Sequence, residues 1–151
     1  MIFIAHRGNV KGIDPTRENS PSYIFEAQSL GYDVEIDVWR SDNKWYLGHD
    51  DPQYLIEEAF LLQEGLWCHA KNMEALEALH KLGANFFWHQ NDCYTLTSRG
   101  YIWAYPGKAL CSNSICVMPE RFSNETHNFD NCVGICSDNV EHFRELLNEV
   151  K

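Results

Sequence analysis

Two histidines and two carboxylates near the start of the chain are of the types that move protons and bind cations. His6 and His49 each stand at the end of a short strand-like run, and Glu35 and Asp37 lie within a third run between them. Because side chains i and i+2 of a strand point to the same face, the two carboxylates share one face of an otherwise apolar strand. A divalent cation removes the free-energy cost of burying them unpaired. These residues predict a metal-assisted site in which imidazoles exchange protons near neutral pH.

Four short motifs that contain these residues follow one another through the first third of the chain. They are His6-Arg7-Gly8, Arg17-Glu18-Asn19-Ser20, Glu35-Ile36-Asp37-Val38 and Gly48-His49-Asp50. In order and spacing they resemble the opening of the glycerophosphodiester phosphodiesterases, where the pattern is His-Arg-Gly, Pro-Glu-Asn-Thr, Glu-x-Asp-Val and His-Asp. Arg17 replaces the proline of that pattern and Ser20 its threonine. Beyond the first third, only the strand pattern continues the resemblance.

The resemblance implies a metal-dependent phosphoric diester hydrolase that acts on a glycerophosphodiester or a related alcohol or sugar phosphodiester. It implies that His6 and His49 are the acid/base pair and that Arg7 binds a phosphate oxygen, a role that suits its planar guanidinium. Glu18 is expected on the substrate side of the site, with helix capping as the alternative for it and for Asn19. The family chemistry would pass through a cyclic phosphate, which is then opened by water or released.

A further strand-like run ends in His69 and Lys71, and here the chain departs from the family. The family usually has Glu-x-Lys at this point, so Lys71 keeps the lysine expected near the phosphate and His69 replaces a metal-binding glutamate. The predicted metal ligands are therefore Glu35, Asp37 and His69. The carboxylates favour Mg²⁺ or Ca²⁺, and the imidazole admits Mn²⁺ or Zn²⁺. Alternatively, the carboxylates hold the cation alone and His69 contacts the substrate.

Two more residues are candidates for contacts with the substrate. His89 follows the apolar residues of the run 85–88 in a polar stretch, where hydrogen bonding within a loop is an equally good explanation. Trp103 alternates with Tyr101 and Tyr105 along one strand. It is a candidate floor for a sugar or glycerol subsite, although core packing is the commoner role of such a pattern.

Strand-like runs alternate with helical patterns and indicate one α/β domain that spans residues 1–151. Strands are expected at 2–5, 33–38, 44–48, 66–69, 85–88, 101–105, 114–118 and 133–136, and helices at 21–30, 52–63, 73–82 and 140–150. Such alternation favours a parallel sheet with right-handed crossovers. In the second half, the intervals 94–100 and 109–113 hold one helical turn at most.

We therefore expect a reduced TIM-type (β/α) barrel, like that of the PLC-like phosphodiesterases. It would have about seven to eight parallel strands, with several helices shortened or missing. The candidate residues come at the carboxyl ends of the strands or just after them, where such barrels place their chemistry. An open doubly wound sheet is the alternative fold.

The net charge of −10 disfavours partners that need a basic surface. Binding to nucleic acid or to an anionic membrane is not expected, and the apolar runs are too short for membrane insertion. We expect a cytoplasmic protein whose partner is a small phosphodiester substrate. The six cysteines form no Cys-x-x-Cys pair and match no zinc spacing, so reduced thiols are expected, most of them in the core.

Two other functions are open at the level of sequence. The short loops of the second half predict a shallow site, which would suit a bulky substrate such as a glycan-linked polyol phosphate. Alternatively, the chain is a catalytically silent barrel that binds a phospholigand and lost its metal through the change at His69. The presence of both His6 and His49 argues against a silent barrel, because a binding protein needs no pair of proton-transfer groups.

Overall fold

The structure, a computed structural model, describes residues 1–122 and 129–149 of the chain. Within these residues the strands are β1 (Ile2–His6), β2 (Asp33–Ser41), β3 (Lys44–Leu47), β4 (Tyr54–Ile56), β5 (Leu66–Ala70), β6 (Phe86–Phe87), β7 (Tyr94–Leu96), β8 (Ile102–Ala104), β9 (Ser114–Val117) and β10 (Gly134–Ser137). The helices are α1 (Pro21–Ser29), α2 (Met73–Leu82) and α3 (Val140–Glu149), with the short 3-10 helices η1 (Glu58–Leu62), η2 (Pro119–Phe122) and η3 (Phe129–Asn131). Val150, the expected last residue of the C-terminal helix, lies outside the described residues.

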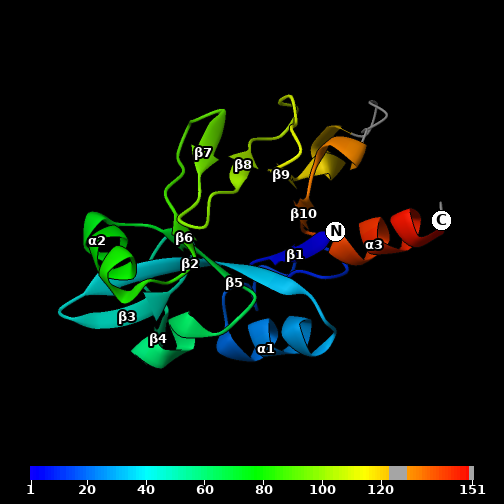
Figure 1. Ribbon diagram of the computed structural model, residues 1–151. Helices are drawn as coiled ribbons and strands as arrows, with labels where there is room; N and C mark the ends of the chain where they lie inside the picture. Colours follow the sequence, from blue (N-terminus) through cyan, green and yellow to red (C-terminus); the bar gives the residue numbers. More distant parts are fainter. Residues whose placement is uncertain (123–128, 150–151) are drawn as a thin grey trace.

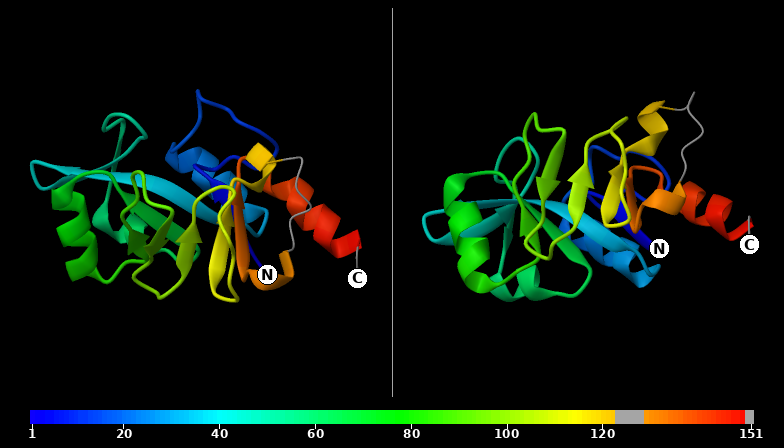
Figure 2. Two further views of the ribbon diagram at one scale, coloured as in Figure 1. Left: turned by 90° about the horizontal axis from the view of Figure 1, so that it is seen from above. Right: turned by 45° about the horizontal axis from the view of Figure 1, so that its top comes forward.

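The strands form one mixed sheet that curls into a half-barrel (Figures 1 and 2). Seven strands run parallel to their neighbours in the spatial order β6-β5-β2-β1-β10-β9-β8. The other three are antiparallel, with β3 and β4 extending the sheet beyond β2 and β7 pairing with β8. The α/β class is confirmed, and the second half of the described chain has the shortened or missing helices that its sequence predicts.

Alternation along the strands divides the core between the two faces of the sheet. On the outer face, Val34, Ile36 and Val38 of β2 pack in one cluster with Ile24 of α1 and Leu79 of α2. Because these three positions of β2 face the helices, the residues between them face the inside of the curl.

The inner face carries an apolar cluster of its own. Six strands contribute to it, through Ile4, Trp67, Phe87, Trp103, Ile115 and Cys136. The segment around β7 joins β6 to β8, because the Ser98 N–H donates to the Phe86 carbonyl at 2.8 Å and the Thr95 hydroxyl donates to the Trp88 carbonyl at 2.8 Å. The two ends of the parallel series are therefore linked through this segment.

Helix boundaries follow the sequence signals for capping. Ser20 caps α1 by accepting a hydrogen bond from the Tyr23 N–H, and Asn72 caps α2 by accepting one from the Ala75 N–H. Gly83 ends α2 at φ +73°, a conformation that glycine adopts without strain. The first turn of α1 begins with Pro21, whose fixed φ suits that position.

One expectation for local structure is wrong, and one strand was not predicted. The segment 52–63 is not a helix, because Tyr54–Ile56 pairs with β3 as β4 and only Glu58–Leu62 is helical, as η1. The segment 94–100, expected to hold one helical turn at most, contains the strand β7. In both places an open strand edge lies nearby, and pairing with it satisfies backbone groups that a short helix would leave unpaired.

All six cysteines are free, as expected, and Cys68, Cys116, Cys132 and Cys136 are buried. Burial raises the pKa of the Cys116 thiol to about 12, so this thiol is protonated and unreactive at neutral pH. None of the helices in residues 1–122 and 129–149 combines the length and the apolar character needed to cross a membrane.

Candidate metal and acid/base site

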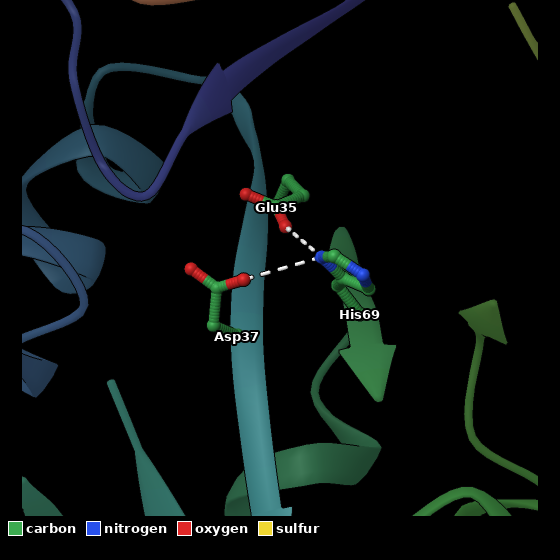
Figure 3. Close-up of side chains that lie close together, drawn as sticks. All are labelled: Glu35, Asp37 and His69. Carbon is green, nitrogen blue, oxygen red and sulfur yellow. Dashed lines mark ion pairs between the residues drawn. The ribbon is translucent and has the colours of Figure 1, made fainter. Parts of the chain in front are cut away.

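Glu35, Asp37 and His69 meet on the inner face of the sheet. The two carboxylates lie one residue apart on β2, and His69 lies opposite Asp37 in the register of β5. The Nδ1 atom of His69 is 3.2 Å from Oδ1 of Asp37 and 3.6 Å from Oε1 of Glu35 (Figure 3). The structure thus brings together the three predicted metal ligands, with one ligand atom of each lying within 4.8 Å of the others.

The burial of the two carboxylates favours a cation at this point. Glu35 is 2% exposed and Asp37 is 1% exposed. Oε2 of Glu35 and Oδ1 of Asp37 are buried, and neither has a hydrogen-bond partner of good geometry among the described residues; their near neighbours are two imidazoles and Lys71 at 3.2–3.7 Å. Two carboxylates buried side by side are costly even beside these groups, and a divalent cation is a partner that suits both.

The orientation of His69 is that of a metal ligand. Its Nε2 lies 2.9 Å from the carbonyl oxygen of His89, which only accepts hydrogen bonds, so Nε2 carries a proton. In the neutral imidazole the lone pair is then on Nδ1, the atom that faces Glu35 and Asp37. A hydrogen bond from the distal nitrogen to a backbone carbonyl is the usual way in which proteins orient a ligating histidine.

The ionisation of this group is strongly perturbed. Burial lowers the pKa of His69, but hydrogen bonds to Asp37 and Glu35 and their negative charges outweigh burial and raise the pKa to about 9. Burial raises the pKa of Asp37, but the hydrogen bond from His69 and the charges of Arg7, His69 and Lys71 hold that pKa well below its usual range. A proton on His69 therefore balances the carboxylates in the metal-free protein, and a metal ion would displace it.

Arg7 and Lys71 flank the carboxylate pair. Nε of Arg7 is 3.0 Å from Oδ2 of Asp37, and Nζ of Lys71 is 3.4 Å from Oδ1 of the same residue. Arg7 follows β1 in the left-handed region at φ +53°, and its N–H donates to the Glu35 carbonyl at 2.9 Å. The turn after β1 therefore directs the guanidinium toward the next strand.

Glu18 and Asn19 form hydrogen bonds that fix the side chains of Arg7 and Asp37, respectively. Oε2 of Glu18 accepts from Arg7 at 3.2 Å and Oε1 accepts from Asn9 at 2.8 Å, and Glu18 does not line the cavity described below. Glu18 was expected on the substrate side of the site. In the structure it orients Arg7 instead and does not itself face the cavity. The Asn19 side chain donates to Oδ2 of Asp37 and accepts from the Asp37 N–H, each at 2.9 Å, which leaves capping to Ser20.

His6 is held by a carboxylate that the sequence did not single out. Its Nδ1 is 2.7 Å from Oδ1 of Asp138, and its Nε2 points toward Glu35 with a separation of 3.7 Å from Oε2. Asp138 follows β10 directly and precedes α3. The register of β1 and β10 pairs Ala5 with Ser137. The residues that follow them, His6 and Asp138, therefore lie side by side. A polar residue directly after the last strand is the signal that could have found Asp138.

His49 enters the site from the loop after β3. It is the most exposed of the predicted catalytic residues, with 42% of its side chain accessible, and its Nδ1 lies 2.7 Å from Oδ1 of Asp50. Asp50 follows His49 in the loop between β3 and β4. Gly48 precedes His49 at φ +151°, and a Cβ at Gly48 would lie 2.1 Å from the Asp51 carbonyl oxygen.

One cavity of about 300 Å³ collects these groups. Its lining includes His6, Arg7, Glu35, His49, His69 and Lys71. The predicted substrate residues His89 and Trp103 also line it, together with Tyr105 and Arg121. All predicted catalytic residues therefore face the same space, and Asp37 lies buried directly behind it.

His89 and Trp103 contribute differently to this cavity. Burial and the nearby charge of His69 lower the pKa of His89, so its imidazole is neutral at pH 7. Trp103 is 3% exposed, and its ring lies 4.5 Å from that of Phe87 and 5.9 Å from that of Trp67. Its main role is therefore core packing, the alternative that its sequence pattern favoured, while one edge reaches the cavity.

Comparison of the chain with protein-family models, with curated proteins and with solved structures finds no match.

Proposed function

We propose that this protein is a metal-dependent phosphoric diester hydrolase that acts on a glycerophosphodiester or a related alcohol or sugar phosphodiester. The observation that carries the proposal is the meeting of a Glu35–Asp37–His69 cation site with two histidines on one small cavity. A cation site alone would suit many functions. Its combination with His6, His49 and two basic residues suits the transfer of a phosphoryl group with protons moving on both sides.

The chain supplies the proton transfers from two directions. Asp138 accepts a hydrogen bond from Nδ1 of His6, which leaves the lone pair of Nε2 free to take a proton from the attacking hydroxyl group. His49, on the opposite loop, gives a proton to the leaving alkoxide. Asp138 and Asp50 hold the two imidazoles by their Nδ1 atoms, so each presents Nε2 to the substrate.

Glu35, Asp37 and His69 would hold the divalent cation, which when bound polarises a phosphoryl oxygen and stabilises the charge that develops there. Arg7 and Lys71 add positive charge beside it, each fixed in place by Asp37. Mg²⁺, Ca²⁺, Mn²⁺ and Zn²⁺ all suit a set of two carboxylates and one imidazole. In this proposal the nucleophile is the neighbouring hydroxyl of the substrate, so the first product is a cyclic phosphate.

The proposed fold is a reduced (β/α) barrel of the PLC-like type. The series of seven parallel strands supports it, as does the link between β6 and β8 through the β7 segment. The site lies at the carboxyl ends of these strands, where barrels of this kind carry their chemistry. Six free cysteines suit action in a reducing compartment, so we also propose a cytoplasmic location.

The proposal is tested by replacing the two histidines. Hydrolysis of glycerophosphoglycerol with added Mn²⁺ or Mg²⁺ should fall by about 10²–10⁴-fold in His6→Ala and in His49→Ala, because each removes one proton transfer. His142→Ala, on α3 and outside the cavity, is the matched control and should keep the wild-type rate. Wild-type rates in either folded variant would refute the two-histidine mechanism. Absence of turnover together with tight phosphate binding would identify a silent binding protein instead.

A further inference from the structure

The cavity contains a cationic side chain that the proposed mechanism does not use. Arg7 and Lys71 are both paired with Asp37, and Arg7 also with Glu18, so their charges are largely balanced within the protein. Arg121 lines the same cavity and is exposed. Among residues 1–122 and 129–149, no side chain makes an ion pair or a hydrogen bond with its guanidinium.

The backbone that carries Arg121 is held firmly against the sheet. Met118 turns the chain at the end of β9 with φ +49°, and its N–H donates to the Cys136 carbonyl at 2.8 Å. Glu120 accepts hydrogen bonds from the Ser137 hydroxyl and the Asp138 N–H, each at 2.9 Å. The 3-10 helix η2 is thereby attached to β10, and Arg121 is presented at the cavity from a fixed position.

Arg121 also lies on a different part of the sheet from the metal ligands. It follows β9, which is three places from β2 in the order β2-β1-β10-β9. At about 4.8 Å per strand this is roughly 14 Å measured along the sheet, and less across the curl. If a phosphodiester is bound at Glu35 and Asp37, Arg121 would lie near the part of the substrate that extends beyond it.

The charge around the site makes such a residue consequential. The chain has a net charge of −10, and four carboxylates gather near the cavity, those of Glu18, Glu35, Asp37 and Asp138. A substrate with two negative charges would be repelled by this surface unless a cation such as Arg121, which has no charged partner among residues 1–122 and 129–149, received the second charge. Arginine is suited to that task because its planar guanidinium binds carboxylates and phosphates through two parallel hydrogen bonds.

We propose that Arg121 recognises an anionic group, a carboxylate or a phosphate, on one alcohol of the diester, so that the preferred substrates carry a second negative charge. This inference rests on the proposed function for the substrate's identity as a diester. It adds a residue that selects among diesters without taking part in the proton transfers.

Turnover of a matched substrate pair tests the selectivity. Glycerophosphoglycerol and glycerophosphoglycerate differ only by a carboxylate in place of a hydroxymethyl group. The wild type should have a kcat/KM about 10-fold higher for the glycerate ester, as expected for one charge-assisted contact at an accessible rim. Arg121→Gln should remove that preference by raising KM for the glycerate ester, while kcat stays the same. Arg99→Gln is the matched control, because it removes the same charge from a residue that donates to the Gly83 carbonyl, away from the cavity.

A binding measurement separates this inference from the proposed function. Calorimetric titration compares glycerol 3-phosphate with two ligands that carry a second anionic group: 3-phosphoglycerate, with a carboxylate, and glycerol 1,3-bisphosphate, with a phosphate. The wild type should bind each of these two about 10-fold more tightly than it binds glycerol 3-phosphate. Arg121→Gln should bind all three with equal affinity. If no diester is hydrolysed but this difference is found, the hydrolase assignment fails and the anion site stands. Equal affinities in the wild type, or an equal loss for all ligands in Arg121→Gln, would overturn the inference and place Arg121 on the diester phosphate itself.

Discussion

At the scale of single residues, the site depends on pairs in which one side chain fixes another. Asp138 holds His6, Asn19 holds Asp37, and Glu18 holds Arg7. His6 and Asp138 are 132 residues apart in the sequence. The sequence predicts the residue types that do chemistry, because their motifs are local. It does not predict Asp138, because only the register of β1 and β10 brings it to His6.

The role of Asp138 leads to a prediction about proton position. In Asp138→Asn the amide can donate to Nδ1 of His6, which moves the imidazole proton to Nε2 and removes the lone pair that accepts the substrate proton. We expect kcat to fall about 10–100-fold with little change in KM. Asp50→Asn is the comparison, because the Asp50 carboxylate contacts His49 in the same way but is 86% exposed, so its loss should lower kcat less than the loss of the Asp138 carboxylate. A larger loss in Asp50→Asn than in Asp138→Asn would contradict this account.

At the scale of elements, the parallel strands and the antiparallel strand β3 were predictable, and the antiparallel strands β4 and β7 were not. β1, β2, β5, β9 and β10 are apolar runs whose period and bounding residues are visible in the sequence. β4 and β7 are three residues long and exist because a neighbouring strand offers an open edge. Such pairing depends on the tertiary structure, so the segment 52–63 was wrongly predicted as a helix. The partly exposed His49 depends on the same region, since its loop runs from β3 to β4.

The loop that carries His49 is therefore open to a test at Gly48. In Gly48→Ala the new Cβ would collide with the Asp51 carbonyl oxygen at 2.1 Å, and the backbone at φ +151° is unfavourable for alanine. We expect the loop to shift, the free energy of unfolding to fall by about 1–3 kcal/mol, and kcat to fall at least 10-fold. Gly31 also has a positive φ, of +81°, but there is open space where a Cβ would lie, and the residue comes after α1, so Gly31→Ala is the control. It should lose stability without losing activity, as measured by urea unfolding and by turnover.

At the scale of the whole molecule, the inside of the curled sheet holds an apolar cluster and, next to it, the charged site. The inner cluster around Trp67, Phe87 and Trp103 fills the curl, and the polar site caps it. Buried charge of both signs is thereby concentrated in one place. The ionisation of that site should consequently be visible in the stability of the entire fold.

The pH dependence of unfolding tests this coupling in chelator-treated protein. Because the pKa of His69 is raised to about 9 in the folded state, above its unfolded value of about 6.5, the charged imidazole stabilises the fold fully below pH 6.5. This contribution, of the order of 3 kcal/mol, should be lost as the pH rises through 9. Urea unfolding at pH 6 and pH 8.5 should show most of the loss. Buried cysteines also destabilise the fold above about pH 8.5, since burial raises their pKa, so the difference from His69→Gln isolates His69. Parallel curves for the two proteins would contradict the assignment.

The central claim is that Glu35, Asp37 and His69 hold a cation that phosphodiester hydrolysis requires. The most direct measurement is the rate of glycerophosphoglycerol hydrolysis by chelator-treated protein as Mg²⁺, Ca²⁺, Mn²⁺ or Zn²⁺ is added back, for the wild type and for Glu35→Gln. We expect no turnover without metal, saturable recovery in the wild type with at least one of these ions, and recovery in Glu35→Gln only at much higher metal concentrations. A wild-type rate that is undiminished in excess chelator would contradict the claim.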